Sequence, residues 1–356
     1  MKSKFPLLAA AVIISCSLSL SAPAKDGDGA TPKPLGREKI LNAFVHIEIK
    51  NLQNESLGRI VDLGIDLVNG RIVEVLVQSD GALDVGGKIV AVPPLALRPD
   101  PTDEKVYRLD VSTAVFKNAA AIDLAKWEDF GRSDRVAAAY HLFGQETYFL
   151  EEGDLASPTA RRPKVSLGYV ERCNKLLEMP VGNHQGEQFG EVWSLTLDIP
   201  KGRILYVIVL APGNFETKSI IPAMAFDFNA KHDALLLDDT KDEYADEPRY
   251  FYTEAAFGNE ATFQREAYKG PRTLVALEQG SSYRDIDMTV RIHRGIRAGK
   301  INGRNVEVGT VNDRVTLRGW VYSADDKRSI GDIARATTVP ELVDNQITVG
   351  KPIASK

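Results

Sequence analysis

The chain repeats itself once along its length, and this repeat constrains its fold more than any other feature. Residues 57–63 (LGRIVDL) align with residues 189–195 (FGEVWSL). At the same offset the match continues through Gly70-Arg71-Ile72 with Gly202-Arg203-Ile204 and, after a shorter loop in the second copy, through Val92-Pro93 with Ile221-Pro222. A constant offset that is broken only in a loop indicates that one structural unit occurs twice.

Each copy predicts short strands joined by tight turns. RIVDL and RIVEVLV lie on either side of Asn69-Gly70 and predict a hairpin. The second copy turns at Lys201-Gly202. A strand IVAVP and a last strand, VYRLDV or ALLLDD, follow. Short, regularly spaced strands are typical of a small antiparallel barrel. The glycines predicted to shape its turns are Gly58, Gly70, Gly86, Gly87, Gly190 and Gly202, with Gly319 in the C-terminal region.

The glycine-rich run DGALDVGGKI is not a nucleotide-binding loop. A phosphate-binding loop has four residues between its first glycine and the Gly-Lys pair, and Ser or Thr after the lysine. Here five residues separate Gly81 from Gly87, and Ile89 follows Lys88. Ile89 cannot ligate a metal, so these glycines are predicted to shape a loop between strands.

These motifs together resemble the PRC-barrel family. The glycine before an apolar strand, the Gly-Arg-Ile turn, the glycine-rich loop and the Val-Pro strand end carry the resemblance over residues 45–111, and less closely over residues 178–240, where APGNFETK replaces the Gly-Gly-Lys loop. The resemblance implies a β-barrel adaptor that binds other macromolecules, and it brings no catalytic residues with it. We call residues 45–111 the first copy and residues 178–240 the second copy.

Helical and linker segments are expected around the second copy. Residues 112–177 contain an alanine-rich, helix-permissive stretch, with Ser133 as a candidate cap and GDLASPTARRP as a linker. The aromatic residues of this segment, Trp127, Tyr140, Phe143 and Tyr148, are expected to pack on a barrel rather than to form a ligand site. Residues 241–284 are predicted to be an acidic linker, because six of the ten residues in 238–247 are acidic. Calcium binding is the alternative, but the EF-hand spacing is absent.

Residues 285–350 change pattern to helix, strand, strand, helix, strand, and resemble the BON domain. Val315-Thr316-Leu317-x-Gly319 is the most specific part of the match, whereas Asn312-Asp313-Arg314 replaces the Asn-Gly turn of that family. The resemblance implies contact with phospholipid surfaces. A basic residue recurs at every third position of the first helix, and these four side chains form the candidate lipid contact: Arg291, Arg294, Arg297 and Lys300. The alternative is that cations near a helix C-terminus interact favourably with its dipole.

The N-terminal segment predicts export. Residues 1–24 combine a basic start, a short apolar run and a small-residue cleavage pattern ending at Ala24, as a bacterial signal peptide does. Alternatively, Cys16 is a lipidation site that would anchor the chain as a lipoprotein. Cys16 is removed with the signal peptide or carries the lipid, so in either case Cys173 has no disulfide partner in the chain. Cys173 is then expected to be buried and inert, or alternatively to be reactive. No later run is apolar enough to span a membrane.

The sequence does not predict an enzyme. Its formal net charge of −5 argues against nucleic-acid binding, and no cofactor, metal or catalytic motif is present. We therefore predict a mainly β protein with an α+β part: two PRC-type antiparallel barrels with helical insertions, followed by an αββαβ BON module. The predicted function is a non-enzymatic, exported or periplasmic adaptor of the bacterial envelope, with an unknown envelope protein as partner. The alternatives are a phospholipid-surface-binding protein in envelope stress and an unrecognised hydrolase.

Overall fold

The computed structural model describes most of the chain after residue 38. The described residues are 39–40, 44, 47–83, 86–151, 165–213, 217–245, 250–251, 275–280, 282–303 and 305–350. They all fall within the second of two compact units, Lys33–Lys356. The predicted signal peptide, Cys16 and the predicted linker at 153–163 lie outside the described residues.

The two copies have the same strand order. The first copy consists of β2 (Glu48–Lys50), β3 (Ser56–Asp66), β4 (Arg71–Ser79), β5 (Ile89–Val92), β6 (Leu97–Pro99) and β7 (Val106–Leu109). The second consists of β9 (Pro180–Asn183), β10 (Gln188–Asp198), β11 (Arg203–Leu210), β12 (Thr217–Pro222), β13 (Asp227–Phe228) and β14 (Leu235–Leu237). Hydrogen bonding follows β5-β4-β3-β2-β7-β6 in the first and β12-β11-β10-β9-β14-β13 in the second. The β2–β7 and β9–β14 pairs are both parallel, unlike the all-antiparallel pairing expected.

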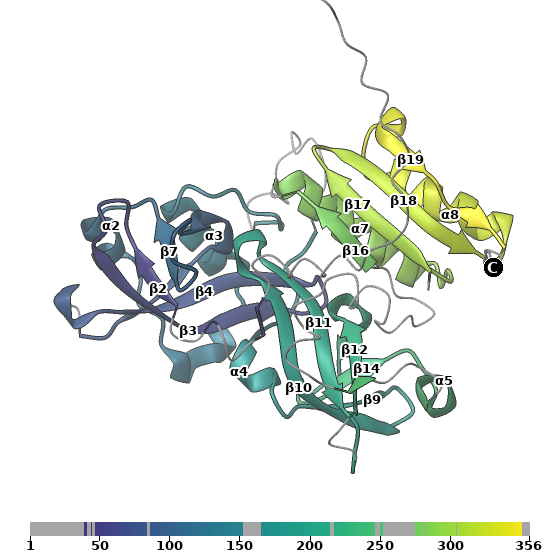
Figure 1. The fold of residues 1–356 in the computed structure, drawn as a ribbon, viewed down its shortest axis with the longest axis horizontal. Helices are drawn as coiled ribbons and strands as arrows, with labels where there is room; N and C mark the ends of the chain where they lie inside the picture. Colours follow the sequence, from purple (N-terminus) through teal and green to yellow (C-terminus); the bar gives the residue numbers. More distant parts are fainter. Residues whose placement is uncertain are drawn as a thin grey trace, which may run out of the picture. The chain divides into compact units, whose positions relative to one another are not determined.

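The copies are joined through β4 and β11 into one sheet rather than standing as separate barrels. Arg71 of β4 pairs with Arg203 of β11, the Ile72 amide donates to the Gly202 carbonyl at 3.0 Å, and the Ile204 amide donates to the Gly70 carbonyl at 3.0 Å. Figure 1 shows β4 and β11 meeting at this point. No pairing among the described strands closes either copy into a ring. The predicted mainly β fold with two copies of one strand order is confirmed, but the two predicted barrels are corrected to one continuous sheet, because backbone groups at the start of each hairpin's second strand pair with their equivalents in the other copy.

The repeat is also visible in the hydrophobic core. One continuous core contains equivalent residues of both copies, among them Leu63 with Leu195 and Val75 with Val207, all fully buried. Burying such side chains contributes about 1.5–3 kcal/mol each. Because the two hairpins share this core, neither copy is packed as an independent unit.

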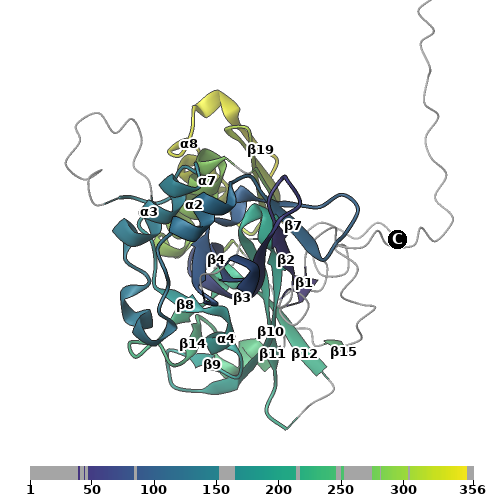
Figure 2. The same ribbon diagram turned by 90° about the vertical axis from the view of Figure 1, so that its left-hand side faces the viewer.

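A helical insertion follows the first copy and packs against it. It contains α2 (Thr113–Asn118), η3 (Leu124–Asp129) and α3 (Ser133–Leu142), and Figure 2 shows α2 and α3 on the same side of this copy. Tyr140 and Tyr148 are buried in the cluster that packs on Val73 and Leu76, as the prediction of a packing role required. The predicted cap is wrong by one residue: Arg132 is the N-cap, which places Ser133 inside the first turn.

Short elements follow β8 (Val170–Arg172) and the second copy. Cys173 starts helix α4 (Cys173–Leu176) and is fully buried, which raises the pKa of its thiol well above the usual value. The thiol is therefore protonated, in agreement with the inert alternative. Part of the expected acidic linker is ordered instead: helix α5 (Lys241–Ala245) buries Tyr244, whose ring stacks on that of Phe189 at a centroid distance of 4.4 Å.

The C-terminal module has the predicted element order with one strand added. It comprises β16 (Val275–Gln279), α7 (Tyr283–Ala298), β17 (Val306–Val311), β18 (Arg314–Val321), α8 (Ala324–Arg335), β19 (Val343–Asn345) and β20 (Thr348–Val349). Figure 1 shows this sheet in green and yellow, and residues of α7 and α8 pack on the apolar face of β17 and β18. The strand VALEQ pairs in parallel with β17, so β16 corrects the linker prediction for 275–279. The predicted closing strand is split into β19 and β20.

The predicted turn glycines lie where the chain bends or where strands approach closely. Positive φ angles are found at Gly58, Gly70, Gly86, Gly87, Gly202 and Gly319. Gly58 and Gly190 occupy equivalent positions, and a Cβ added to either would lie 2.0 Å from the Gln78 carbonyl oxygen or 2.2 Å from that of Leu210. A backbone carbonyl cannot shift without disturbing its strand. Both copies therefore require glycine where these neighbouring strands approach each other.

We expect Gly58→Ala and Gly190→Ala each to lower the free energy of unfolding by more than about 1 kcal/mol, because the new methyl group would collide with a backbone carbonyl. Gly81→Ala is the matched control, since a Cβ there meets no atom within 4 Å. The control should change stability by less than about 0.5 kcal/mol. Urea denaturation measures all three, and equal effects at positions 58 and 81 would contradict the explanation.

Candidate functional site

Two repeat-related arginines meet where the copies join. Arg71 and Arg203 are the first residues of β4 and β11, and they lie opposite one another in the only described pair between those strands. Their exposed fractions are 2% and 6%. Because a buried charge is costly unless it is paired or hydrogen-bonded, the partners of these arginines determine what the junction does. We refer to Arg71 and Arg203 with their contacts as the arginine junction.

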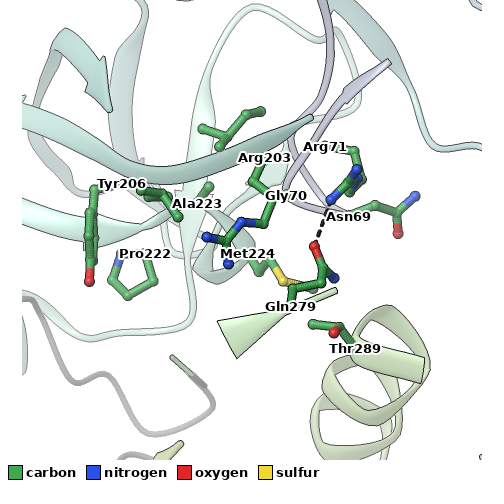
Figure 3. Close-up of a pocket in the computed structure, with 12 residues that line it drawn as sticks. Asn69, Gly70, Arg71, Arg203, Tyr206, Pro222, Ala223, Met224, Gln279 and Thr289 are labelled. Carbon is green, nitrogen blue, oxygen red and sulfur yellow. Dashed lines mark hydrogen bonds between the residues drawn. The ribbon is translucent and has the colours of Figure 1, made fainter. Parts of the chain in front are cut away.

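Arg71 reaches out of its own copy in two directions. Its Nη2 donates to the Lys201 carbonyl of the second copy at 2.8 Å, and its Nη1 donates to Oε1 of Gln279 on β16 at 2.7 Å (Figure 3). The guanidinium also lies over the Tyr148 ring, 5.4 Å from its centroid. Burial lowers the pKa of Arg71 to about 10, so the side chain remains cationic at neutral pH. One side chain thus bridges both copies and the C-terminal module.

The equivalent arginine is bound differently. Arg203 Nη2 donates to the Asp198 carboxylate of its own copy at 3.2 Å. The aspartate at the equivalent position of the first copy, Asp66, instead accepts from Asn69 and from the Gly168 amide. This difference leaves the Arg71 guanidinium directed at Lys201 and Gln279, and the pseudosymmetric junction becomes asymmetric.

The small cavity at the junction does not have room for a metabolite. It has a volume of about 40 Å³, whereas one water needs about 10–15 Å³ and small-molecule sites measure about 300–1,000 Å³. Figure 3 shows its lining, which includes Asn69, Gly70, Arg71, Arg203, Tyr206, Pro222, Ala223, Met224, Gln279 and Thr289. The junction is therefore a structural connection rather than a ligand site.

Most of the predicted lipid-contact stripe on α7 faces the chain's own side chains and carbonyls. Arg297 pairs with Asp227 of β13 and lies 3.8 Å from Asp238. Arg294 Nη2 donates to the Ser166 carbonyl at 3.3 Å. Arg291 lies 3.5 Å from Asp287 and donates to the Ala336 carbonyl at 3.2 Å. Only Lys300 lies beyond the end of the helix and is exposed. Sequence reasoning missed most of these contacts because Asp227, Ser166 and Ala336 lie far away along the chain, although Asp287 is only four positions from Arg291.

An exposed aromatic edge lies on the other face of the C-terminal sheet. Along β18, Val315, Leu317 and Val321 are buried under the helices, while Arg318 is exposed and Trp320 is half-buried. The Trp320 ring packs edge-on against that of Tyr322, with centroids 5.0 Å apart, and Tyr322 is 63% exposed. We refer to Arg318, Trp320 and Tyr322 as the aromatic edge.

The described residues do not assemble a metal site. They contain no group of three or more His, Cys, Asp or Glu side chains at metal-binding distances. Burial raises the pKa of Glu74 to about 7 and lowers that of His293 to about 3. Glu74 pairs with Arg135, and His293 is buried on α7, so each shift reflects packing. In the described part of the chain, no helix has the length and apolarity needed to cross a membrane.

The Arg71–Gln279 contact is expected to be a strong coupling. We expect Arg71→Leu to cost about 1–3 kcal/mol of stability, because it leaves two neutral acceptors, the Lys201 carbonyl and the Gln279 amide oxygen, without their donor. A double-mutant cycle with Gln279→Leu should give a coupling energy of about 1–3 kcal/mol. Arg98→Leu is the control, because Arg98 is exposed, and it should cost less than about 0.5 kcal/mol. Additive effects of the two junction substitutions in chemical denaturation would show that the contact does not join the modules energetically.

Comparison with known families identifies two of the three modules. Family models match residues 170–244 as a PRC-barrel domain and residues 287–351 as a BON domain, and no curated protein matches the chain. The PRC-barrel match covers the second copy, although the sequence resemblance was predicted to be closer in the first. The first copy shares its strand order but is not itself matched. The chain contains a PRC-barrel domain followed by a C-terminal BON domain.

Proposed function

We propose that this chain is a non-catalytic adaptor of the bacterial envelope, in which the PRC-type copies hold a protein partner and the BON domain contacts the envelope. The observation that carries the proposal is the arginine junction: Arg71 joins both copies to β16 through hydrogen bonds of 2.8 and 2.7 Å. Modules joined in this way can transmit a fixed geometry between a partner and a surface. The families found are not enzymatic ones, which agrees with this role.

The proposed location is outside the cytoplasm. It rests on the signal-like residues 1–24, and on the presence of a BON domain, a type often found in periplasmic or envelope-associated proteins. Anchoring through a lipid on Cys16 is the alternative within this proposal.

Contact with phospholipid as the primary function is a second candidate, and the aromatic edge favours it. Tryptophan and tyrosine are amphipathic and suit the membrane–water interface, and Arg318 would attract anionic headgroups. The α7 stripe supports this candidate less, because Arg297 is already paired with Asp227. No observation on the described residues favours a hydrolase.

Crosslinking mass spectrometry on intact cells tests the adaptor role. We expect crosslinks from exposed lysines of both copies, such as Lys105 and Lys201, to recur on one envelope protein. The Arg71→Leu variant should change which lysines of the partner crosslink to the BON domain, because the arginine junction would no longer fix the position of the BON domain. Crosslinks confined to this chain, or scattered over unrelated abundant proteins, would count against an adaptor.

Co-sedimentation with anionic vesicles tests the lipid role. If the aromatic edge makes the contact, the double variant Trp320→Ser, Tyr322→Ser should bind about tenfold more weakly, because burial of two aromatic side chains is lost. Leu142→Ser, at a 44% exposed leucine of the insertion, is the matched control. A loss caused by Lys300→Glu but not by the double variant would place the contact just after the C-terminal end of α7 instead. Absence of wild-type binding would exclude the lipid role.

A further inference from the structure

A larger, open pocket lies away from the arginine junction. It has a volume of about 710 Å³, within the range of small-molecule sites. Its walls come from η3 and the start of α3, from the β8–α4 segment, and from the loop between β13 and β14. Figure 2 shows β8 and β14 on the same side of the ribbon. The residues that line it are Leu124, Trp127, Gly131, Arg132, Gly168, Tyr169, Val170, Glu171, Arg172, Lys175, Lys231 and His232.

Aromatic side chains held by their neighbours form part of the lining. The rings of Tyr169 and His232 are stacked with centroids 3.7 Å apart, and the Tyr169 hydroxyl donates to Glu171 at 2.9 Å. His232 has a left-handed φ of 58°, which is uncommon for a residue other than glycine, and its ring is held by the stacking on Tyr169. Trp127 stacks on Phe130 and donates from Nε1 to the Val170 carbonyl at 3.2 Å. These contacts preorganise flat apolar surfaces around the pocket.

The pocket is cationic on an acidic chain. Four basic residues line it against a single acid, Glu171. Arg172 is bound to Asp62 at 2.8 Å, and Arg132 to Asp134 at 2.8 Å. Lys175 and Lys231 are exposed, and no ion pair of either is found among the described residues. These two lysines come from segments far apart in the sequence, so the excess positive charge arises only in the folded chain.

We propose that this pocket binds a small anionic ligand, a phosphate monoester or a carboxylate, that carries a flat or apolar group. Lys175 and Lys231 pair with the anion, and the Trp127 and Tyr169 rings contact the apolar part. The combination is specific: a bare inorganic anion would leave the aromatic surfaces unused, and a neutral apolar molecule would leave the lysines unused. The site does not depend on the proposed adaptor role, and either can stand without the other.

The test uses the full chain with Trp193→Phe and Trp320→Phe, which leaves Trp127 as the one remaining tryptophan of three. Tryptophan fluorescence is followed during titration with phenyl phosphate, benzoate and, as the neutral analogue, benzyl alcohol. We expect saturable binding of at least one anion and none of benzyl alcohol. Saturation by phenyl phosphate alone assigns the ligand to phosphate monoesters, and saturation by benzoate alone assigns it to carboxylates.

Charge-reversal variants then test the lysines. Lys175→Glu and Lys231→Glu should each weaken binding about tenfold, since each removes an attraction and adds a repulsion. Lys105→Glu, an exposed lysine outside the pocket, is the matched control and should leave the affinity unchanged. Near-ultraviolet circular dichroism and Tm show whether each variant is folded, and the wild-type affinity should also fall as salt is raised. Failure of both anions to saturate, equal binding of benzyl alcohol, or unchanged affinity in the double Lys→Glu variant would overturn the proposal.

Discussion

The buried guanidinium of Arg71 is the interaction on which the arrangement of this protein depends. Removing a charge from water costs several kcal/mol unless hydrogen bonds replace its hydration. Arg71 meets part of this requirement with acceptors from two other parts of the chain, Lys201 and Gln279, while its buried Nε has no hydrogen-bond partner among the described residues. These two hydrogen bonds form only when both copies and β16 are in place, so the junction favours one arrangement of the described modules.

The duplicated unit explains how such a junction arises. In two copies of one hairpin, the same backbone groups are free at the same place, and they pair reciprocally through Gly70 and Gly202. The side chains then diverge: Arg203 keeps the aspartate of its own copy, and Arg71 does not. A symmetric junction of backbones thus carries an asymmetric set of side-chain contacts, and this asymmetry provides the attachment point for the C-terminal module.

The same docking decides which surfaces are available for function. The cationic stripe on α7 would be a plausible membrane contact on an isolated BON domain, but Arg297 is held by Asp227 and Arg294 by the Ser166 carbonyl. The aromatic edge around Trp320 is on the other face of the sheet. The contacts within the chain therefore show, better than helix periodicity does, which basic side chains remain available to a partner.

Local signals in the sequence determined the strands, turns and helices of each module. Short runs rich in Val, Ile and Leu predict β3 and β4, Asn312 and Asp313 adopt the left-handed angles of a tight hairpin turn, and Gly58 and Gly190 are required by the carbonyl that faces them. These properties depend on neighbours in the sequence or on a single strand pairing, so the element order of the PRC-barrel and BON domains could be predicted.

Only the tertiary structure decided how the elements come together. Arg71 and Gln279 are 208 positions apart, Arg297 and Asp227 are 70 apart, and Lys175 and Lys231 share a pocket across most of the second copy. Hydrophobic periodicity says which face of an element is buried, but it does not say against which other element. Long-range strand pairing joins the two copies, and long-range ion pairs and hydrogen bonds occupy the cationic stripe. Folding also brings the two lysines of the proposed anion pocket together. None of these contacts leaves a local pattern in the sequence.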